Sequence, residues 1–129
     1  MNDKLWSFIR ENIGKFVETD GVHWAQCVDL TKAWFLALGL PAYRGNAYEY
    51  GRGFHPEALE WIVNQPFNFP NPGDIVVVRG WNYVHVGICT SANRLTFDMF
   101  HQNYPVGSPA TIGRFNYLAP RALGWLRPR

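Results

Sequence analysis

Residues 26–38, QCVDLTKAWFLAL, are the stretch that decides the fold. Their apolar positions recur at helical spacing and Gly39 follows them as a stop signal, so we predict one helix over this range. The polar residues 17–25 precede the helix and form a loop that contains a turn signal. Cys27 therefore lies in the first turn of a buried helix that follows a polar loop.

The rest of the chain predicts an α+β domain in which helices precede an antiparallel sheet. Residues 1–16 predict a helix whose shared apolar face carries Leu5, Ile9, Ile13 and Phe16. Residues 42–54 indicate an irregular loop, and residues 56–63 indicate either a short helix or a loop with one turn. Runs of β-branched and aromatic residues predict a sheet of about five or six strands, at 75–79, 83–90, 94–102, 112–118 and 122–126.

Composition excludes several classes of protein. The 129 residues are 47% hydrophobic, which suits one domain over 1–129 and argues against disorder. The net charge is only +2 and Lys and Arg form no run, so nucleic acid is not an expected partner. No segment reaches the roughly 20 apolar residues that span a bilayer. The amino terminus lacks a secretory pattern, so we expect synthesis in the cytoplasm and free thiols at Cys27 and Cys89.

The position of Cys27 suits a nucleophile. Free N–H groups at a helix amino terminus lower the pKa of a thiol and can hold an oxyanion beside the attacking sulfur. The side chain of Gln26 can add a further amide donor. Taken alone, Cys27 is better explained as a small buried residue that packs the helix.

Two segments of the second half offer partners for this thiol. His85 lies within an apolar strand, where a buried imidazole needs a partner, and Gly87 on the same face predicts open space for a cleft. His101 and Asn103 are two residues apart and are expected on one strand face, where either can orient the imidazole of His85. The alternatives are a satisfied core histidine for His85, a surface position for His101 and a turn residue for Asn103. The order of cysteine, histidine and polar pair favours catalysis.

The local motifs resemble the CHAP family of cysteine, histidine-dependent amidohydrolases and peptidases, within the papain-like and NlpC/P60-like group. The resemblance runs from about residue 17 to the end of the chain. It rests on Asp20-Gly21, Gln26-Cys27-Val28-Asp29-Leu30, Pro72-Gly73-Asp74-Ile75-Val76-Val77, His85-Val86-Gly87-Ile88, Gln102-Asn103-Tyr104 and Gly124-Trp125-Leu126-Arg127-Pro128.

The resemblance implies a papain-like fold and a role for each matching residue. Cys27 is the implied nucleophile, and His85 is the implied base that later protonates the leaving amine. The family's acidic residue falls at position 101, where this chain has His101. Related NlpC/P60-type enzymes use a histidine as the third member, so His101 remains a candidate, and Asn103 is the alternative.

Some phage-encoded members that this chain resembles carry calcium in the loop before the cysteine. A hard cation of this kind prefers six or more oxygen ligands. The alternative explanation makes Asp20 a turn former and Asp29 an acid in the first helical turn. The positions that match the calcium site are Glu18, Asp20, Val22, Trp24 and Asp29.

The implied function is hydrolysis of an amide bond in peptidoglycan, by an N-acetylmuramoyl-L-alanine amidase or an endopeptidase. The expected protein is a bacteriophage endolysin made in the host cytoplasm and released through holins, or a hydrolase carried by a virion. It is expected to be monomeric, without a separate wall-binding domain. The alternatives are a non-catalytic wall-binding or virion structural module and a papain-like toxin that modifies proteins.

Overall fold

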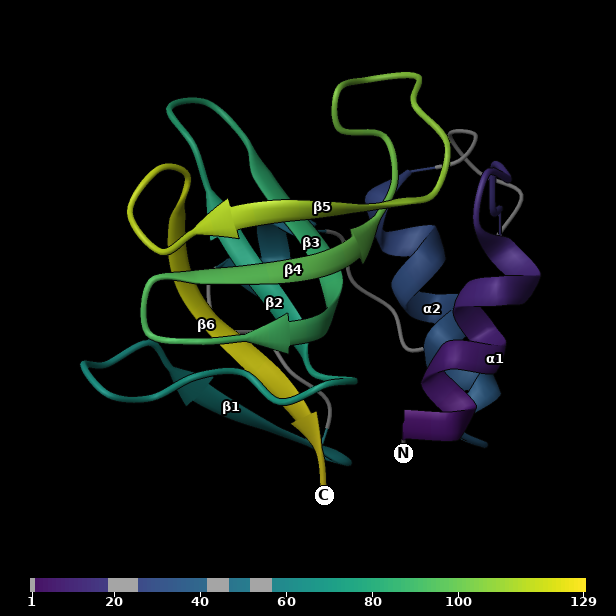
Figure 1. Ribbon diagram of the computed structural model, residues 1–129, viewed down its shortest axis with the longest axis horizontal. Helices are drawn as coiled ribbons and strands as arrows, with labels where there is room; N and C mark the ends of the chain where they lie inside the picture. The colour runs from purple at the N-terminus through teal and green to yellow at the C-terminus, as the bar shows by residue number, and fades with distance from the viewer. Residues whose placement is uncertain (1, 19–25, 42–46, 52–56) are drawn as a thin grey trace.

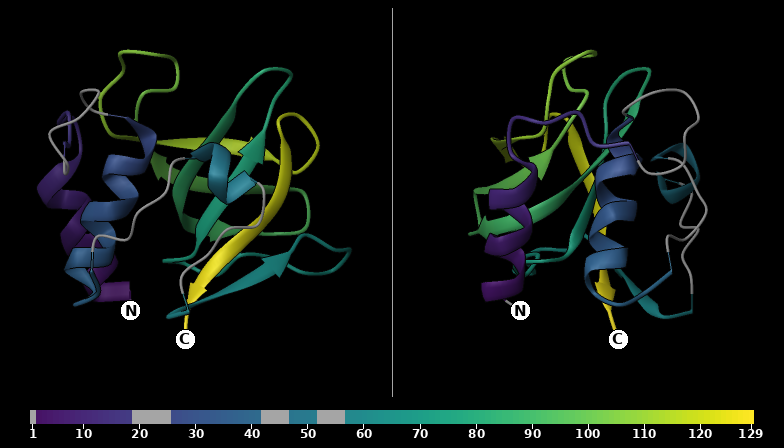
Figure 2. Two further views of the ribbon diagram at one scale, coloured as in Figure 1. Left: turned by 180° about the vertical axis from the view of Figure 1, so that it is seen from behind. Right: turned by 90° about the vertical axis from the view of Figure 1, so that its right-hand side faces the viewer.

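The computed structural model describes residues 2–18, 26–41, 47–51 and 57–129. The helices in these ranges are α1 (Asn2–Asn12), α2 (Cys27–Ala37) and α3 (Ala47–Gly51). The strands are β1 (Leu59–Val63), β2 (Ile75–Arg79), β3 (Val84–Ala92), β4 (Thr96–His101), β5 (Thr111–Asn116) and β6 (Arg121–Pro128). Figures 1 and 2 show α1 and α2 side by side at one end of a strongly twisted sheet.

The strands form one antiparallel sheet in the order β1-β6-β2-β3-β4-β5. β2 to β5 follow one another as a meander, and β6 returns to lie between β1 and β2. The α+β class and the six-stranded antiparallel sheet agree with the sequence prediction. None of the described helices is long and apolar enough to cross a membrane.

The helix predicted around Cys27 is confirmed as α2. It begins after Gln26, whose backbone N–H donates to Asp29 Oδ2 over 2.8 Å, which closes the first turn. Trp34 and Phe35 are fully buried against the sheet. The helix ends at Ala37, and Gly39 with φ of +79° supplies the left-handed residue that terminates it.

A buried hydrogen bond ties α2 to the turn before β2. Trp34 Nε1 donates to the carbonyl oxygen of Gly73 over 2.9 Å, and Gly73 adopts a φ of +95°. The next residue, Asp74, accepts from Arg127 Nη2 on β6 over 2.8 Å. These contacts hold the helix, the start of β2 and the end of β6 in one arrangement.

The sheet is buried on both faces because its strands alternate between two apolar clusters. The helix-side cluster includes Val77 of β2 and Val86 of β3. The cluster on the opposite face includes Val76, Met99 and Trp125. α1 and α2 therefore cover one face, while the sheet curls over its own second core.

The first helix, the loop over 42–54 and the strand over 94–102 differ from their predictions in extent or type. α1 stops at Asn12 because Gly14 adopts a φ of +80°, so Ile13 and Phe16 are each 49% exposed instead of sharing the buried face of Leu5 and Ile9. The predicted loop 42–54 contains the short helix α3. The predicted strand 94–102 is confined to β4, which leaves Leu95 in the preceding turn and 78% exposed.

The range 56–63, predicted as a short helix or a loop with one turn, contains strand β1 (Leu59–Val63). β1 pairs with β6 from Leu59↔Pro128 to Val63↔Gly124. A five-residue segment is too short for its periodicity to separate strand from helix, so its partner at the far end of the chain decides its structure.

Candidate active site

Two buried histidines meet where β3 and β4 lie side by side. His85 Nε2 lies 2.9 Å from His101 Nδ1, and the two rings are nearly perpendicular at 80°. His85 is only 3% exposed and His101 only 4%. Each imidazole therefore supplies the polar partner that burial of the other requires.

Glycines make room for this pair. A Cβ atom at Gly87 would come within 2.6 Å of Met99 Sδ and 3.0 Å of His101 Cβ. A Cβ atom at Gly113 would lie 2.7 Å from His101 Nε2. The expected open cleft beside Gly87 is therefore wrong, because β4 fills that space and brings His101 against His85.

Aromatic rings enclose the two imidazoles. Tyr104 stacks on His85 with ring centroids 4.7 Å apart and planes at 22°. Phe115 packs its ring edge to face with His101 at 5.1 Å. Tyr104 is held in turn by a 2.7 Å hydrogen bond between its hydroxyl and that of Tyr83. The His85 ring is thus oriented by its hydrogen bond to His101 and by the stacking of Tyr104 on its face.

Burial keeps both histidines neutral at neutral pH. Loss of solvation lowers the pKa of His85 to about 3, and the proximity of His101 adds to the effect. Loss of solvation alone lowers the pKa of His101 to about 4. A single proton therefore occupies the 2.9 Å contact, with one imidazole as donor and the other as acceptor.

Cys27 begins α2, and its sulfur lies against β3. Burial raises the pKa of the thiol. Hydrogen bonds from the backbone of Val86, Val28 and Cys27 itself oppose this rise but do not cancel it. The helix amino terminus therefore lowers the pKa of Cys27 as expected, but burial raises it by more. Cys27 is a neutral thiol in the absence of substrate.

The contact with Val86 places Cys27 one residue from His85 along β3. In the described part of the chain, no hydrogen bond joins the thiol to the His85 ring. Contacts of this kind often tighten only when substrate binds. The structure therefore brings Cys27 and His85 into the same region without joining them by a hydrogen bond.

Asn103 contacts Gln26 rather than His85. Its Nδ2 donates to Gln26 Oε1 over 3.3 Å, and its Oδ1 accepts from the Gly107 backbone over 2.7 Å. The expectation that Asn103 shares a strand face with His101 is wrong, because β4 ends at His101 and Asn103 has a φ of +63°. Asn103 thus positions the amide of Gln26 beside Cys27.

Gln102 is a site residue that the sequence analysis quoted in a motif but did not select. It is 1% exposed, and its Nε2 donates over 2.7 Å to the backbone oxygens of both Gln26 and Val17. Its Oε1 accepts from the Val17 N–H over 3.0 Å. Gln102 therefore fastens the residue before Cys27, and the chain that leads to it, onto the end of β4.

A surface cavity of about 460 Å³ adjoins the histidine pair. Tyr104 lines it and also stacks on His85, so the ring of Tyr104 separates the cavity from the imidazole. Trp81, at the β2–β3 turn, also lines it and is 99% exposed. The cavity therefore presents an aromatic surface on the side of Tyr104 that faces away from the buried histidines.

The proposed calcium ligands lie mostly outside the described residues. Asp20, Val22 and Trp24 are in this group. Glu18 is exposed, and Asp29 is buried with Oδ2 accepting the Gln26 N–H. The donor set consists entirely of oxygens and so suits a hard cation.

Comparison with known proteins agrees with this architecture. The model of the CHAP domain family matches residues 17–103. A solved structure of a wild-type endolysin, LysIME-EF1, superposes with a TM-score of 0.81 at 28% identity, covering 98% of this chain and 63% of that one. The structure of Ly7917 with the hydrolyzing product of MDP gives 0.66 at 14% identity, covering 99% of this chain and 63% of that one.

The chain thus spans about 63% of the length of these two proteins. A comparison with curated proteins found no match. The family model covers well over half of the sequence, including Cys27, His85, His101 and Asn103. This chain belongs to the CHAP domain family.

Proposed function

We propose that this chain hydrolyses an amide bond in peptidoglycan, with Cys27 as the nucleophile and His85 as the base. The observation that carries the proposal is the buried His85–His101 hydrogen bond, one residue from the point where β3 contacts the Cys27 thiol. Membership of the CHAP family and likeness to an endolysin support the choice of substrate.

The neutral groups imply proton transfer during attack. Nε2 of His85 is engaged with His101, which leaves Nδ1 for the thiol. As Sγ bonds to the carbonyl carbon, its proton moves to Nδ1, and the resulting imidazolium then protonates the leaving amine. Water, deprotonated by the same imidazole, cleaves the thioester and returns the free thiol.

The oxyanion formed during attack needs donors beside the sulfur. Backbone N–H groups in the first turn of α2 point out of the helix and carry its positive dipole end. The side-chain oxygen of Gln26 accepts a hydrogen bond from Asn103 Nδ2, and the amide of Gln26 is the side-chain donor that we propose for the oxyanion. Gln26 and Asn103 thus act together in the proposal.

His101 is proposed to position His85. When Nδ1 of His85 is the base, its Nε2–H donates to Nδ1 of His101. A neutral imidazole fixes this tautomer but stabilises the imidazolium less than a carboxylate does. The site therefore provides orientation with little charge stabilisation.

The bond cleaved is either the N-acetylmuramoyl–L-alanine amide or a peptide bond of the stem or cross-bridge. Release from a host cell through holins, delivery by a phage virion and a monomeric state belong to the same proposal. One observation favours a second function, because a thiol with a raised pKa also suits a non-catalytic wall-binding module.

Replacing the nucleophile separates these two functions. We expect Cys27→Ala to lower the release of muropeptides from purified walls by at least about 1000-fold, because no other group forms the thioester. Turbidity loss measures the rate, and mass spectrometry of the products identifies the bond. Equal lysis by wild type and variant would refute cysteine catalysis, and wall binding without release by the wild type would identify the module.

The role of His101 is tested by a pair of variants. His101→Ala should lower kcat about 100-fold, because His85 loses the acceptor that fixes its tautomer. His101→Asn can place Oδ1 near the position of Nδ1 and should recover most of this loss. Equal rates for both variants would mean that His101 packs the core without positioning the base.

Neutral histidines also make folding stability depend on pH. Because the folded pKa values lie below the unfolded value of 6.5, the unfolded chain binds more protons as pH falls below about 6.5. Stability from this pair is therefore fully present above pH 6.5 and is lost toward pH 4. In urea unfolding at pH 7, 6 and 5, the free energy of unfolding should fall more steeply for wild type than for His101→Asn. The difference in slope should be up to about 1.4 kcal/mol per pH unit. Parallel profiles would contradict the neutral pair.

Calcium binding is proposed at Glu18, Asp20, Val22, Trp24 and Asp29. Calcium should raise the melting temperature. At a hundredfold excess of calcium over Kd, the free energy of unfolding should increase by about 3 kcal/mol, and a chelator should reverse both effects. Glu18→Gln is the matched variant, because this side chain is exposed and its loss should leave the metal-free melting temperature unchanged. An identical calcium response in wild type and variant would remove Glu18 from the site, and no response in either would remove the metal.

A further inference from the structure

Phe67 occupies a backbone position that normally requires glycine or asparagine. The Asn68 N–H donates to the Gln65 oxygen over 3.1 Å and closes a four-residue turn. Pro66 holds the second position, and Phe67 holds the third with a φ of +70°. This is the arrangement of a type II turn, whose third residue is usually glycine or asparagine and is disfavoured for a bulky side chain such as Phe.

Burial of the Phe67 side chain does not offset the cost of its positive φ. The Phe67 side chain is 79% exposed, so the apolar core gains little from it. The positive φ of Phe67 and the exposure of its aromatic ring to water each lower the stability of the folded state. Strain of this kind concentrates where a side chain contacts a ligand.

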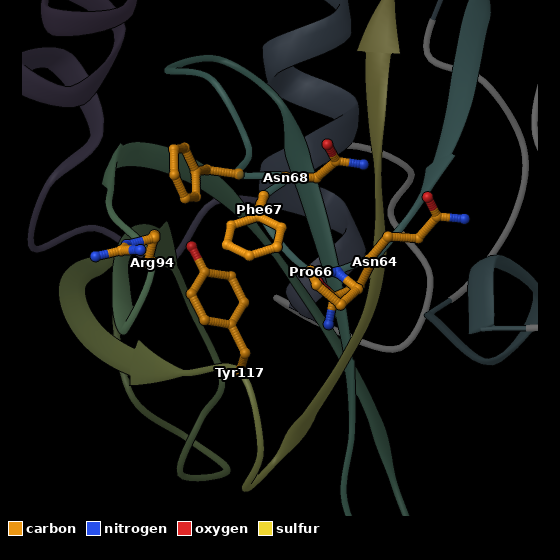
Figure 3. Close-up of a pocket in the computed structure, with 8 residues that line it drawn as sticks. Asn64, Pro66, Phe67, Asn68, Arg94 and Tyr117 are labelled. Atoms are coloured by element: carbon orange, nitrogen blue, oxygen red, sulfur yellow. The ribbon is translucent and has the colours of Figure 1, made fainter.

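The turn forms one wall of a cavity of about 360 Å³ (Figure 3). Phe67 shares this cavity with the aromatic rings of Phe69 and Tyr117. Tyr117 is held in place because its hydroxyl donates to the Asn93 oxygen over 2.6 Å. The carboxamides of Asn64 and Asn68 and the guanidinium of Arg94 supply polar groups at the same opening.

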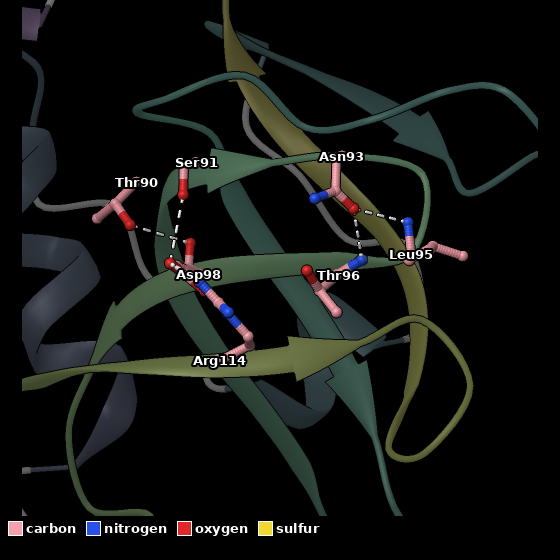
Figure 4. A network of polar contacts seen from close by, with 7 residues as sticks. All are labelled: Thr90, Ser91, Asn93, Leu95, Thr96, Asp98 and Arg114. Atoms are coloured by element: carbon pink, nitrogen blue, oxygen red, sulfur yellow. Dashed lines mark hydrogen bonds and ion pairs between the residues drawn. The ribbon is translucent and has the colours of Figure 1, made fainter.

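Arg94 is presented by an ordered turn between β3 and β4. The Asn93 Oδ1 accepts the N–H groups of Leu95 and Thr96 over 2.8 and 2.9 Å (Figure 4). Arg94 makes no ion pair with any residue in the described ranges. Its charge is therefore available to a carboxylate of a bound molecule.

We propose that this cavity is a second binding site for the wall polymer, and that an N-acetylated sugar of the glycan strand stacks on Phe67. Aromatic faces bind the apolar face of a pyranose, carboxamides pair with hydroxyl and acetamido groups, and Arg94 matches the acidic groups of peptidoglycan. The identity of the polymer rests on the proposed function.

The cavity neighbours the one that Tyr104 lines beside His85. Tyr117 lines this cavity, and the next residue, Leu118, lines the cavity that shares Tyr104 with the His85 stack. Figure 1 shows the β2–β3 turn, the β5–β6 loop and the segment after β1 along one side of the molecule. β4 begins at Thr96, two residues after Arg94, and ends at His101, a length of about 17 Å at a rise near 3.3 Å per residue. A glycan strand held at Phe67 therefore extends toward the active site without contacting the cleaved bond.

The test uses variants that remove the ring and relieve the strain together. Phe67→Asn and Phe67→Gly both accept a positive φ, so each should keep or raise the melting temperature. In the Cys27→Ala background, which prevents cleavage, each should weaken binding to purified peptidoglycan sacculi about 5- to 10-fold. Leu95→Asn is the matched control, because it removes an exposed apolar side chain that does not line the cavity.

Kinetics and a small ligand complete the experiment. With Cys27 intact, the Phe67 variants should raise KM and leave kcat unchanged, because the cavity holds the polymer away from the reacting bond. N-acetylglucosamine tetramer should shift the NMR signals of residues 64–69, and Arg94→Gln should weaken sacculus binding but not tetramer binding, since the tetramer has no carboxylate.

The failures of the two proposals differ. Sacculus binding by Phe67→Asn equal to that of Leu95→Asn would overturn the second site, as would a lower melting temperature in both Phe67 variants. Loss of binding at Phe67 in a protein whose wild type releases no muropeptides would instead support the second site and refute hydrolysis.

Discussion

The hydrogen bond between His85 Nε2 and His101 Nδ1 is the interaction on which the candidate site depends. Two imidazoles with 3% and 4% exposure satisfy each other in surroundings that otherwise offer aromatic rings. This contact requires that β3 and β4 pair in a single register, since a shift of one residue would turn His101 to the other face. It also requires glycine at 87 and 113, where a Cβ would meet Met99 and His101.

The same contact limits the chemistry that the site can perform. A carboxylate at position 101 would stabilise a protonated His85 more strongly, but it would be a charge buried beside Phe115. Histidine avoids that cost and remains neutral, as its lowered pKa requires. The arrangement therefore favours a well-defined tautomer over stabilisation of the imidazolium, which fits a thiol that is also neutral at rest.

Sequence reasoning succeeded where the signal was local. The helix beginning at Cys27 followed from apolar spacing and Gly39, and β2 followed from its β-branched run. It failed where a partner distant in sequence decides the outcome. β1 is a strand because it pairs with β6, and the space beside Gly87 is filled because β4 supplies Met99 and His101. Neither Gln102 nor the contact from Asn103 to Gln26 has a local signature, because both depend on where β4 ends relative to α2.

Two features of this chain lower its stability, and they lie toward opposite ends of β4. At one end two polar rings are buried, and at the other an aromatic ring is exposed on a backbone suited to glycine. Folding alone would select apolar residues at 85 and 101 and glycine or asparagine at 67. Natural sequences depart from such preferences mainly at functional sites. Because these two departures lie toward opposite ends of β4, they fit the proposed polymeric ligand, which can reach both, better than a small molecule bound at His85 alone.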